Sequence, residues 1–141
     1  MIADKLITLM EQHEGVRHTV YRCTGGKLTI GVGHNLEDNP VSDTVIRLLL
    51  EEDIGHCVRE LCSIFPMFHS YGDARQAALI SMMFMGAGSF RGFKRMIEAI
   101  QASDWEKASV EALDSQWARQ VKSRANEIAV MLLNNTWSEA V

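Results

Sequence analysis

Residues 13–34, HEGVRHTVYRCTGGKLTIGVGH, constrain the fold more than any other stretch of the chain. Two short runs rich in β-branched and aromatic residues, Thr19–Tyr21 and Leu28–Ile30, flank the turn sequence Thr24–Gly26. Residues of this kind suit a pleated strand, and glycine readily adopts the positive φ angles of a tight turn. The stretch therefore predicts a β-hairpin in which both glycines of the turn have positive φ angles.

Gly31 and Gly33 follow the second run, on either side of Val32. Because glycine has no Cβ, the backbone at these positions can pass close to a ligand or to another segment of the chain. Both possibilities remain open from the residues alone.

A helix is predicted over about 3–13, because apolar residues recur there at spacings of three and four. Glu14 follows directly, and packing of the apolar stripe would partly desolvate its carboxylate. Desolvation raises the pKa of a carboxyl group, which suits a general acid. The alternative, from residue type alone, is a solvated glutamate at a helix end. The stripe consists of Ile2, Leu6, Leu9, Met10 and His13.

The rest of the chain predicts helices. A long one over about 43–64 begins after Ser42, which can cap it, and ends before Pro66. We therefore expect an α+β, mainly helical chain with a small β-hairpin lobe and a larger helical lobe. Further predicted elements are a helix over 74–85 capped by Asp73, a helix over 90–102, a helix opened by a capping box at 103–106, a turn at 115–120 and a last helix over 122–134.

Length and composition predict one globular domain, with 141 residues, 47% hydrophobic and 23% charged. Charged residues interrupt every long apolar run, so we expect no membrane-spanning helix. The N-terminal residues lack the pattern of a secretory signal. A net charge of −4, with no dense basic run, disfavours nucleic-acid binding.

The chain has three cysteines, Cys23, Cys57 and Cys62. Their spacing is not that of a zinc site, so we expect no metal ion, and nothing in the sequence indicates a cofactor. Cys57 and Cys62 are best interpreted as small, buried apolar residues.

The order Glu14-Gly15, Tyr21, Gly26 and Thr29–His34 resembles the phage-type lysozymes, the endolysins of glycoside hydrolase family 24. In that family a Glu is followed nine positions later by an Asp, or sometimes a Cys, and six positions further on by a Thr. Glu14, Cys23 and Thr29 have this spacing, so the resemblance implies that they are catalytic. An unperturbed thiol has a pKa of about 8.5, against about 3.9 for Asp, so Cys23 is mostly neutral near pH 7 unless its surroundings lower that value.

Downstream matches extend the resemblance over roughly the whole chain. It implies that Arg124 supports the catalytic carboxylate, that Gly33 and Phe84 contact substrate, and that His34 and Asp53 form a structural pair. The matching positions are Phe84, Gly86, Phe90, Trp105, Ser115, Trp117, Arg124 and Trp137, of which the three tryptophans are expected to pack in the core or between the lobes.

The resemblance also implies a lysozyme-like fold with a cleft between its lobes. We expect a single domain over 1–141, with a β-containing lobe at about 14–40 and a connecting helix at about 43–65. Residues 66–141, together with 1–13, are expected to form the helical lobe.

The implied function is that of a muramidase that hydrolyses the β-1,4 bond between N-acetylmuramic acid and N-acetylglucosamine and so lyses the host cell. Its partner would be the glycan strands of bacterial peptidoglycan, with no nucleic acid and no stable membrane insertion. We expect a monomer that stays in the host bacterial cytoplasm until it is released to the wall. Two alternatives remain: a lytic transglycosylase, and a wall-binding lysozyme-like domain without activity.

Overall fold

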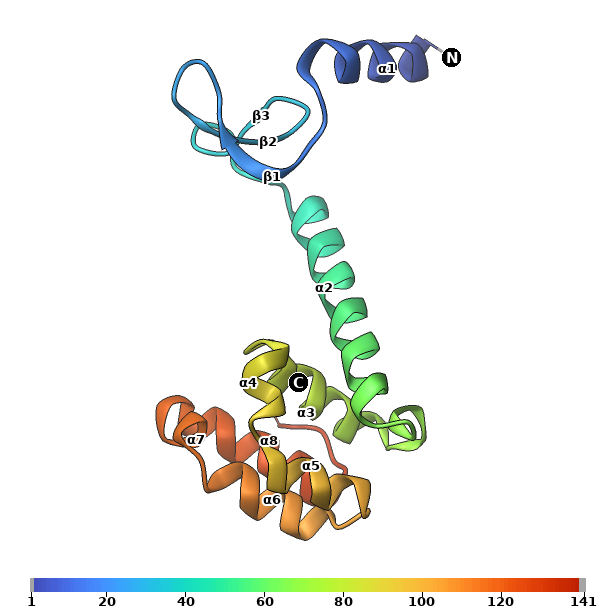
Figure 1. The fold of residues 1–141 in the computed structure, drawn as a ribbon, viewed down its shortest axis with the longest axis vertical. Coiled ribbons are helices and arrows are strands. Elements are labelled where there is room, and N and C mark those ends of the chain that lie inside the picture. The colour runs from blue at the N-terminus through green and yellow to red at the C-terminus, as the bar shows by residue number, and fades with distance from the viewer. Residues whose placement is uncertain (1, 140–141) are drawn as a thin grey trace. The chain divides into compact units, whose positions relative to one another are not determined.

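The structure is a computed structural model that describes residues 2–139. It divides into two compact units, residues 1–49 and 50–141 (Figure 1). Helices dominate, and one small antiparallel sheet accompanies them, which confirms the α+β, mainly helical class. No helix in the described part of the chain has the length and apolar character needed to cross a membrane.

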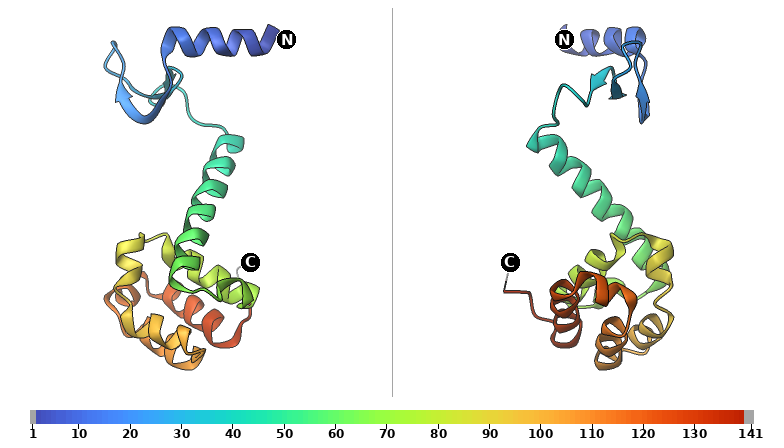
Figure 2. Two further views of the ribbon diagram at one scale, coloured as in Figure 1. Left: turned by 45° about the vertical axis from the view of Figure 1, so that its right-hand side comes forward. Right: turned by 90° about the vertical axis from the view of Figure 1, so that its left-hand side faces the viewer.

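The N-terminal unit contains helix α1 (Ile2–Glu14) and the strands β1 (Arg17–Arg22), β2 (Leu28–Gly31) and β3 (His34–Asn35), drawn as arrows in Figure 2. The strands lie in the order β1-β2-β3, and both pairs are antiparallel. The predicted hairpin is confirmed, whereas the two-residue strand β3 was not predicted.

The hairpin turn is closed by two backbone hydrogen bonds. The Gly26 N–H donates to the Cys23 carbonyl at 2.8 Å, and the Cys23 N–H donates to the Lys27 carbonyl at 3.0 Å. Only Gly26 has a positive φ, of 78°, so the expectation that Gly25 would also have one is wrong.

Helix α1 extends one residue further at each end than predicted, and none of its residues is buried. Its apolar stripe is therefore not covered within the N-terminal unit. Packing of residues 1–13 with the helical lobe stays a prediction.

Helix α2 (Asp43–Ile64) has the predicted bounds and runs from the first unit into the second. The Ser42 hydroxyl caps it by accepting a hydrogen bond from the Val45 N–H at 3.3 Å. The other unit continues with the short 3-10 helix η1 (Phe68–Ser70) and six α-helices: α3 (Asp73–Met83), α4 (Ala87–Arg91), α5 (Lys94–Gln101), α6 (Trp105–Leu113), α7 (Gln116–Val121) and α8 (Ser123–Asn134).

The core of the described chain lies in the helical unit, where every buried apolar residue falls between Leu61 and Leu132. Arg75 joins α3 to the end of α8, because its Nε and Nη2 donate to the carbonyls of Leu132 and Leu133 at 2.7 and 2.9 Å. The largest fully buried side chains are Leu61, Phe65, Phe68, Leu79, Met82, Phe90, Met96, Ile100 and Leu132. Each contributes about 1.5–3 kcal/mol through burial of apolar surface.

Two of the predicted caps are wrong. Helix α3 is capped at Gly72, and Asp73 is its first residue, with no side-chain cap. Helix α6 is capped by Asp104 alone, whose carboxylate accepts from the Lys107 N–H at 3.1 Å. The preceding Ser103 has φ 59° and takes no part in a capping box.

Two predicted segments also differ from the structure. The helix expected over 90–102 is divided into α4 and α5, because Phe93 has non-helical backbone angles (φ −78°, ψ 58°). Its ring packs edge-on against Trp117, with 5.9 Å between the centroids. The turn expected over 115–120 is instead the short helix α7, which Ser115 caps.

Trp105 and Trp117 pack against the core as expected. Trp105 contacts Tyr71 edge-on at 4.9 Å. Trp137 is 54% exposed, so it does not lie in the core, and packing between the lobes stays a prediction. It follows the C-terminal end of α8, where few neighbours can cover it.

Candidate active site

Glu14 is the last residue of α1, and the β2–β3 turn passes against its side chain. A β-carbon added at Gly33 would lie 3.2 Å from Oε2 of Glu14, a tighter approach than side chains normally make. Gly33 also has φ +68°, which disfavours any residue with a Cβ. The close approach expected at Gly33 is thus to Glu14 itself. Contact between Gly33 and a substrate stays a prediction.

The Glu14 side chain is exposed in the structure. The partial desolvation expected from the stripe of α1 is therefore absent within the N-terminal unit, because none of the residues of that helix is covered there.

Cys23 follows β1 and is half-buried. The pKa of its thiol is lowered, first by the backbone N–H of Lys27, then by the backbone N–H of Gly25 and the hydroxyl of Thr29, all of which hydrogen-bond to the sulfur. Partial burial opposes this effect. The turn therefore favours the thiolate, the form of cysteine that can accept a proton or attack carbon.

Thr29 lies on β2 and is only 2% exposed. Its hydroxyl donates to the Lys27 carbonyl at 2.8 Å. Because a hydroxyl has one proton and can rotate, Thr29 can donate either to this carbonyl or to the Cys23 sulfur. The structure thus brings Cys23 and Thr29 together, and their catalytic roles stay predictions.

His34 begins β3, and its Nε2 lies 3.0 Å from the backbone carbonyl oxygen of Asn39. Its proposed partner Asp53 lies on α2 in the other unit. The His34–Asp53 pair stays a prediction.

Arg124 and Phe84 belong to the helical unit. Nη2 of Arg124 donates to the carbonyl and to the hydroxyl of Ser81 at 3.0 and 3.2 Å, which fixes the guanidinium against α3. Phe84 follows the end of α3 and is 47% exposed, so its ring is accessible to a ligand. Their roles toward Glu14 and toward substrate stay predictions.

The groups that position these side chains were not predicted from the sequence. Ser81 holds Arg124, and the Lys27 N–H acts on the Cys23 sulfur. A backbone donor has no signature in the residue types, and Ser81 lies 43 positions from Arg124, so only the folded chain reveals either partner.

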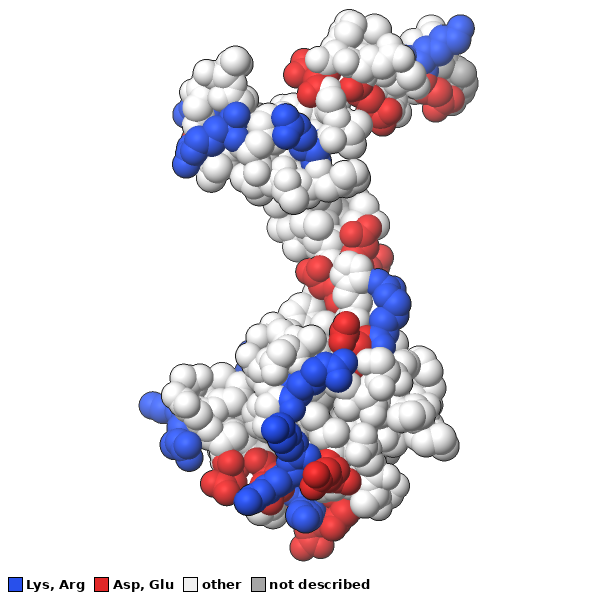
Figure 3. All heavy atoms as spheres, viewed as in Figure 1, with Lys and Arg blue, Asp and Glu red and all other residues white. Residues whose placement is uncertain are grey.

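Charged side chains of both signs lie on the surface. In the N-terminal unit, Lys27 lies 3.8 Å from Glu37 and 3.5 Å from Asp38, and Arg22 lies 3.8 Å from Glu37. Figure 3 shows basic side chains with acidic ones beside them on the helical unit as well. Within the described residues, no three His, Cys, Asp or Glu side chains are grouped so that they could hold a metal ion.

Comparison with known proteins assigns the family. The family model for phage lysozyme matches residues 11–130, which is most of the chain. The chain belongs to the phage lysozyme family. The matched range includes Glu14, Cys23, Thr29 and Arg124. Membership in the phage lysozyme family supports a lysozyme-like, peptidoglycan-degrading function.

The chain is similar to three curated proteins, two of which are named as T4-type lysozymes. The chain is 30% identical to the pre-baseplate central spike protein Gp5 of Enterobacteria phage T4, an alignment that covers 89% of the chain but only 27% of the spike protein. It is 25% identical to Probable T4-type lysozyme 2 of Dictyostelium discoideum, covering 98% of the chain and 99% of that protein. It is also 25% identical to Probable T4-type lysozyme 1 of the same organism, covering 91% and 93%.

Proposed function

We propose that this phage lysozyme is a muramidase that hydrolyses the β-1,4 bond between N-acetylmuramic acid and N-acetylglucosamine in peptidoglycan, and that it acts as an endolysin in host cell lysis. The main support is that the family match spans Glu14, Cys23 and Thr29. The glycine backbone against the Glu14 carboxylate and the hydrogen-bond donors around the Cys23 sulfur add to it.

In the proposed mechanism, Glu14 is the general acid. Its carboxyl proton goes to the glycosidic oxygen as the bond to the anomeric carbon breaks, and the sugar develops positive charge. Gly33 leaves room beside this carboxylate, which a Cβ would reduce. Arg124 is proposed to support the carboxylate from the helical unit.

Cys23 is the proposed second group. As a thiolate it takes the proton of a water molecule that attacks the anomeric carbon, and the Thr29 hydroxyl orients that water or the sulfur. The lowered pKa of Cys23 compensates in part for the replacement of an Asp, because it increases the thiolate fraction near neutral pH. A thiolate can also attack the anomeric carbon itself, which would retain the configuration of the product.

Product analysis tests the reaction. Purified peptidoglycan treated with the protein is expected to yield muropeptides with reducing ends, each one water heavier than the anhydro products of a lytic transglycosylase. Anhydro ends would contradict hydrolysis. NMR of the freshly formed reducing end then separates water attack, which inverts the anomeric configuration, from attack by sulfur, which retains it. If the protein binds the wall but releases no fragments, the muramidase proposal fails.

A further inference from the structure

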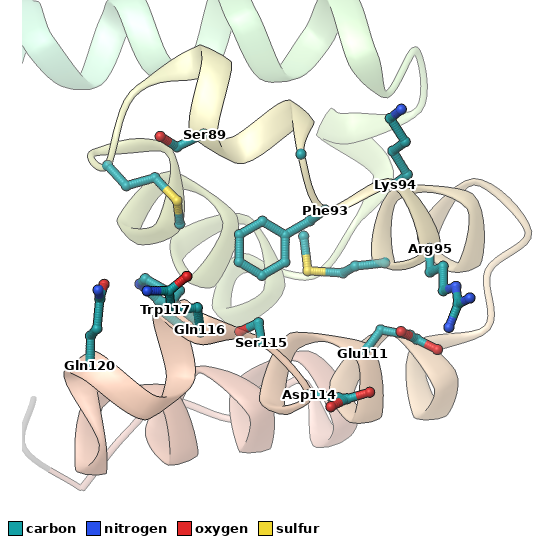
Figure 4. A pocket seen from close by; sticks show the side chains of 13 residues that line it. Ser89, Phe93, Lys94, Arg95, Glu111, Asp114, Ser115, Gln116, Trp117 and Gln120 are labelled. Atoms are coloured by element: carbon teal, nitrogen blue, oxygen red, sulfur yellow. The ribbon is translucent and has the colours of Figure 1, made fainter.

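Charged side chains without a part in the proposed mechanism differ in whether they adjoin a proposed reacting group. In the helical unit, Arg95 and Glu111 lie toward the same end of a pocket of about 840 Å³ (Figure 4), and none of the residues assigned to the proposed chemistry lines that pocket. In the N-terminal unit, Arg22 donates a hydrogen bond to the hairpin turn that contains Cys23. The charged groups of this turn are therefore direct neighbours of a proposed reacting group.

The sulfur of Cys23 lies against the backbone of its own turn. A β-carbon added at Gly25 would lie 3.8 Å from Sγ of Cys23, and the Lys27 N–H donates a hydrogen bond to the sulfur. The Cys23 N–H donates in turn to the Lys27 carbonyl at 3.0 Å, so the two residues face each other across the turn. The orientation of the Lys27 N–H thus decides how well it reaches the sulfur.

The peptide bond that carries this N–H has a second contact on its opposite side. The Lys27 N–H and the Gly26 carbonyl belong to one planar trans peptide unit, in which the two groups point in opposite directions. Nη1 of Arg22 donates to the Gly26 carbonyl at 2.9 Å. The guanidinium therefore fixes the peptide plane, and its charge makes the N–H a stronger donor because linked hydrogen bonds polarise one another.

Glu37 holds both this arginine and the next peptide bond. Its Oε1 lies 3.8 Å from Nη1 of Arg22 and accepts a hydrogen bond from the Leu28 N–H at 3.3 Å. The carbonyl of that next peptide unit, which belongs to Lys27, is the one that accepts from the Cys23 N–H. These two peptide bonds, each in contact with Cys23, thus have a charged side chain on the other side.

The remaining charged groups beside the turn are the Lys27 ammonium and the Asp38 carboxylate. Nζ of Lys27 lies 3.5 Å from Oδ1 of Asp38 and 3.8 Å from Oε2 of Glu37. Among the described residues, this ammonium makes no hydrogen bond to the backbone of the turn. Lys27 therefore provides a matched cation, which has the same charge as Arg22 but does not hold the Gly26 carbonyl.

We propose that Arg22 is a positioning residue for Cys23, because it holds the Gly26–Lys27 peptide bond with the Lys27 N–H directed at the sulfur. Glu37 supports this arrangement by pairing with the guanidinium. Arg22 acts on the reaction only through the backbone of the turn. The inference rests on the proposed function, in which Cys23 takes a proton as a thiolate.

The test is the pH midpoint of the rate at which iodoacetamide alkylates Cys23, followed by mass spectrometry in the full-length protein. Arg22→Gln should raise this midpoint by roughly 0.5 pH unit, the effect of one exposed charged contact, because the thiolate keeps a weaker donor. Lys27→Gln removes the same charge but leaves the Gly26 carbonyl held, so its midpoint should stay close to that of wild type. Equal shifts in the two variants, or no shift in Arg22→Gln, would overturn the proposal.

Two further measurements separate positioning from damage to the sheet. In Arg22→Gln the NMR signal of the Lys27 amide should move, whereas the amides of Ile30 and His34, which pair β2 with β3, should keep their wild-type positions. An unmoved Lys27 amide would contradict the proposal. Arg22→Lys keeps a charged donor, so its alkylation midpoint should lie below that of Arg22→Gln, and a midpoint equal to or above it would also count against the proposal.

Alkylation requires no bond cleavage, so this result is separate from that of the product analysis. In a protein that hydrolyses peptidoglycan with Cys23 as base, the acidic limb of the pH–rate profile of Arg22→Gln should move up by the same amount as the alkylation midpoint. Hydrolysis with an unshifted alkylation midpoint would leave the muramidase proposal intact and reject only the role of Arg22. A shifted midpoint in a protein that cleaves nothing would support the role of Arg22 and reject the muramidase proposal.

Discussion

Cys23 obtains its chemical character from the turn in which it lies. The backbone N–H groups of Lys27 and Gly25 and the hydroxyl of Thr29 hydrogen-bond to its sulfur and lower the pKa of the thiol. Cys57, on α2, has the opposite environment: burial, and secondly the Asp53 carboxylate, raise the pKa of its thiol. The protein therefore contains two cysteines that should respond differently to pH.

The first prediction concerns alkylation of these thiols. Since only the thiolate reacts, Cys23 should be modified by iodoacetamide with a midpoint below the ordinary value of about 8.5, and Cys57 with a midpoint above it. Mass spectrometry of the peptides across a pH series measures both, and modification of Cys23 should be accompanied by loss of lysis. The unfolded protein is the control, in which the two midpoints should coincide. Equal midpoints in the folded protein would contradict the assigned hydrogen bonds.

The second prediction concerns Gly33, for which Gly31 is a matched control. The two have nearly the same φ, +68° and +69°, but a Cβ at Gly31 would meet nothing within 4 Å. Either change to Ala should therefore cost a similar free energy of unfolding, about 1–2 kcal/mol. Only Gly33→Ala displaces the Glu14 carboxylate, so its lysis rate should be roughly tenfold below that of Gly31→Ala. Equal rates for the two folded variants would show that the approach to Glu14 has no catalytic consequence.

Among the elements, α6 packs mainly against α5 and α8. The Asp104 carboxylate caps the N-terminus of α6 by accepting a hydrogen bond from the Lys107 N–H. Asp104→Ala should lower the free energy of unfolding by about 1 kcal/mol, and Asp104→Asn, which keeps an acceptor oxygen, should lose much less. Urea denaturation followed by circular dichroism measures both. A destabilisation by Asn as large as that by Ala would mean that the charge, and not the cap, stabilises the helix.

The elements also show what sequence patterns can and cannot predict. Helices α1, α2 and α8 and the hairpin have clear apolar periodicity or turn residues, and their bounds were predicted to within a residue or two. The break at Phe93 was missed because apolar residues continue on both sides of it, and packing against Trp117 favours the non-helical backbone there. Helix α7 was missed because six residues are too few to show a helical period.

The residues of the candidate site also divide into those that the sequence could predict and those that it could not. Glu14, Cys23 and Thr29 could be selected because their spacing matches a family pattern. The partners that act on them come from backbone groups or from distant segments, such as Gly33 against Glu14 and Ser81 against Arg124. These contacts depend on the folded chain, which no local pattern in the sequence describes.

At the scale of the molecule, the buried apolar residues of the described chain all belong to the helical unit, whereas the only buried residue of the N-terminal unit is Thr29. Most of the free energy of unfolding should therefore come from the helical unit. A fragment of residues 43–141 is expected to keep its helices and to unfold cooperatively in urea, and a fragment of residues 1–42 should be unfolded. A 43–141 fragment without a cooperative transition would show that the core requires the N-terminal residues.

The proposed mechanism depends most on Glu14 as the acid, and its direct test is the rate at which permeabilised Gram-negative cells are cleared. Glu14→Gln is compared with wild type and with Glu11→Gln, which removes another exposed carboxylate from the same helix. If Glu14 is the general acid, the clearing rate of Glu14→Gln should fall by at least about 10²-fold, the usual contribution of a general acid, and that of Glu11→Gln should be nearly unchanged. Clearing by Glu14→Gln at the wild-type rate would contradict it.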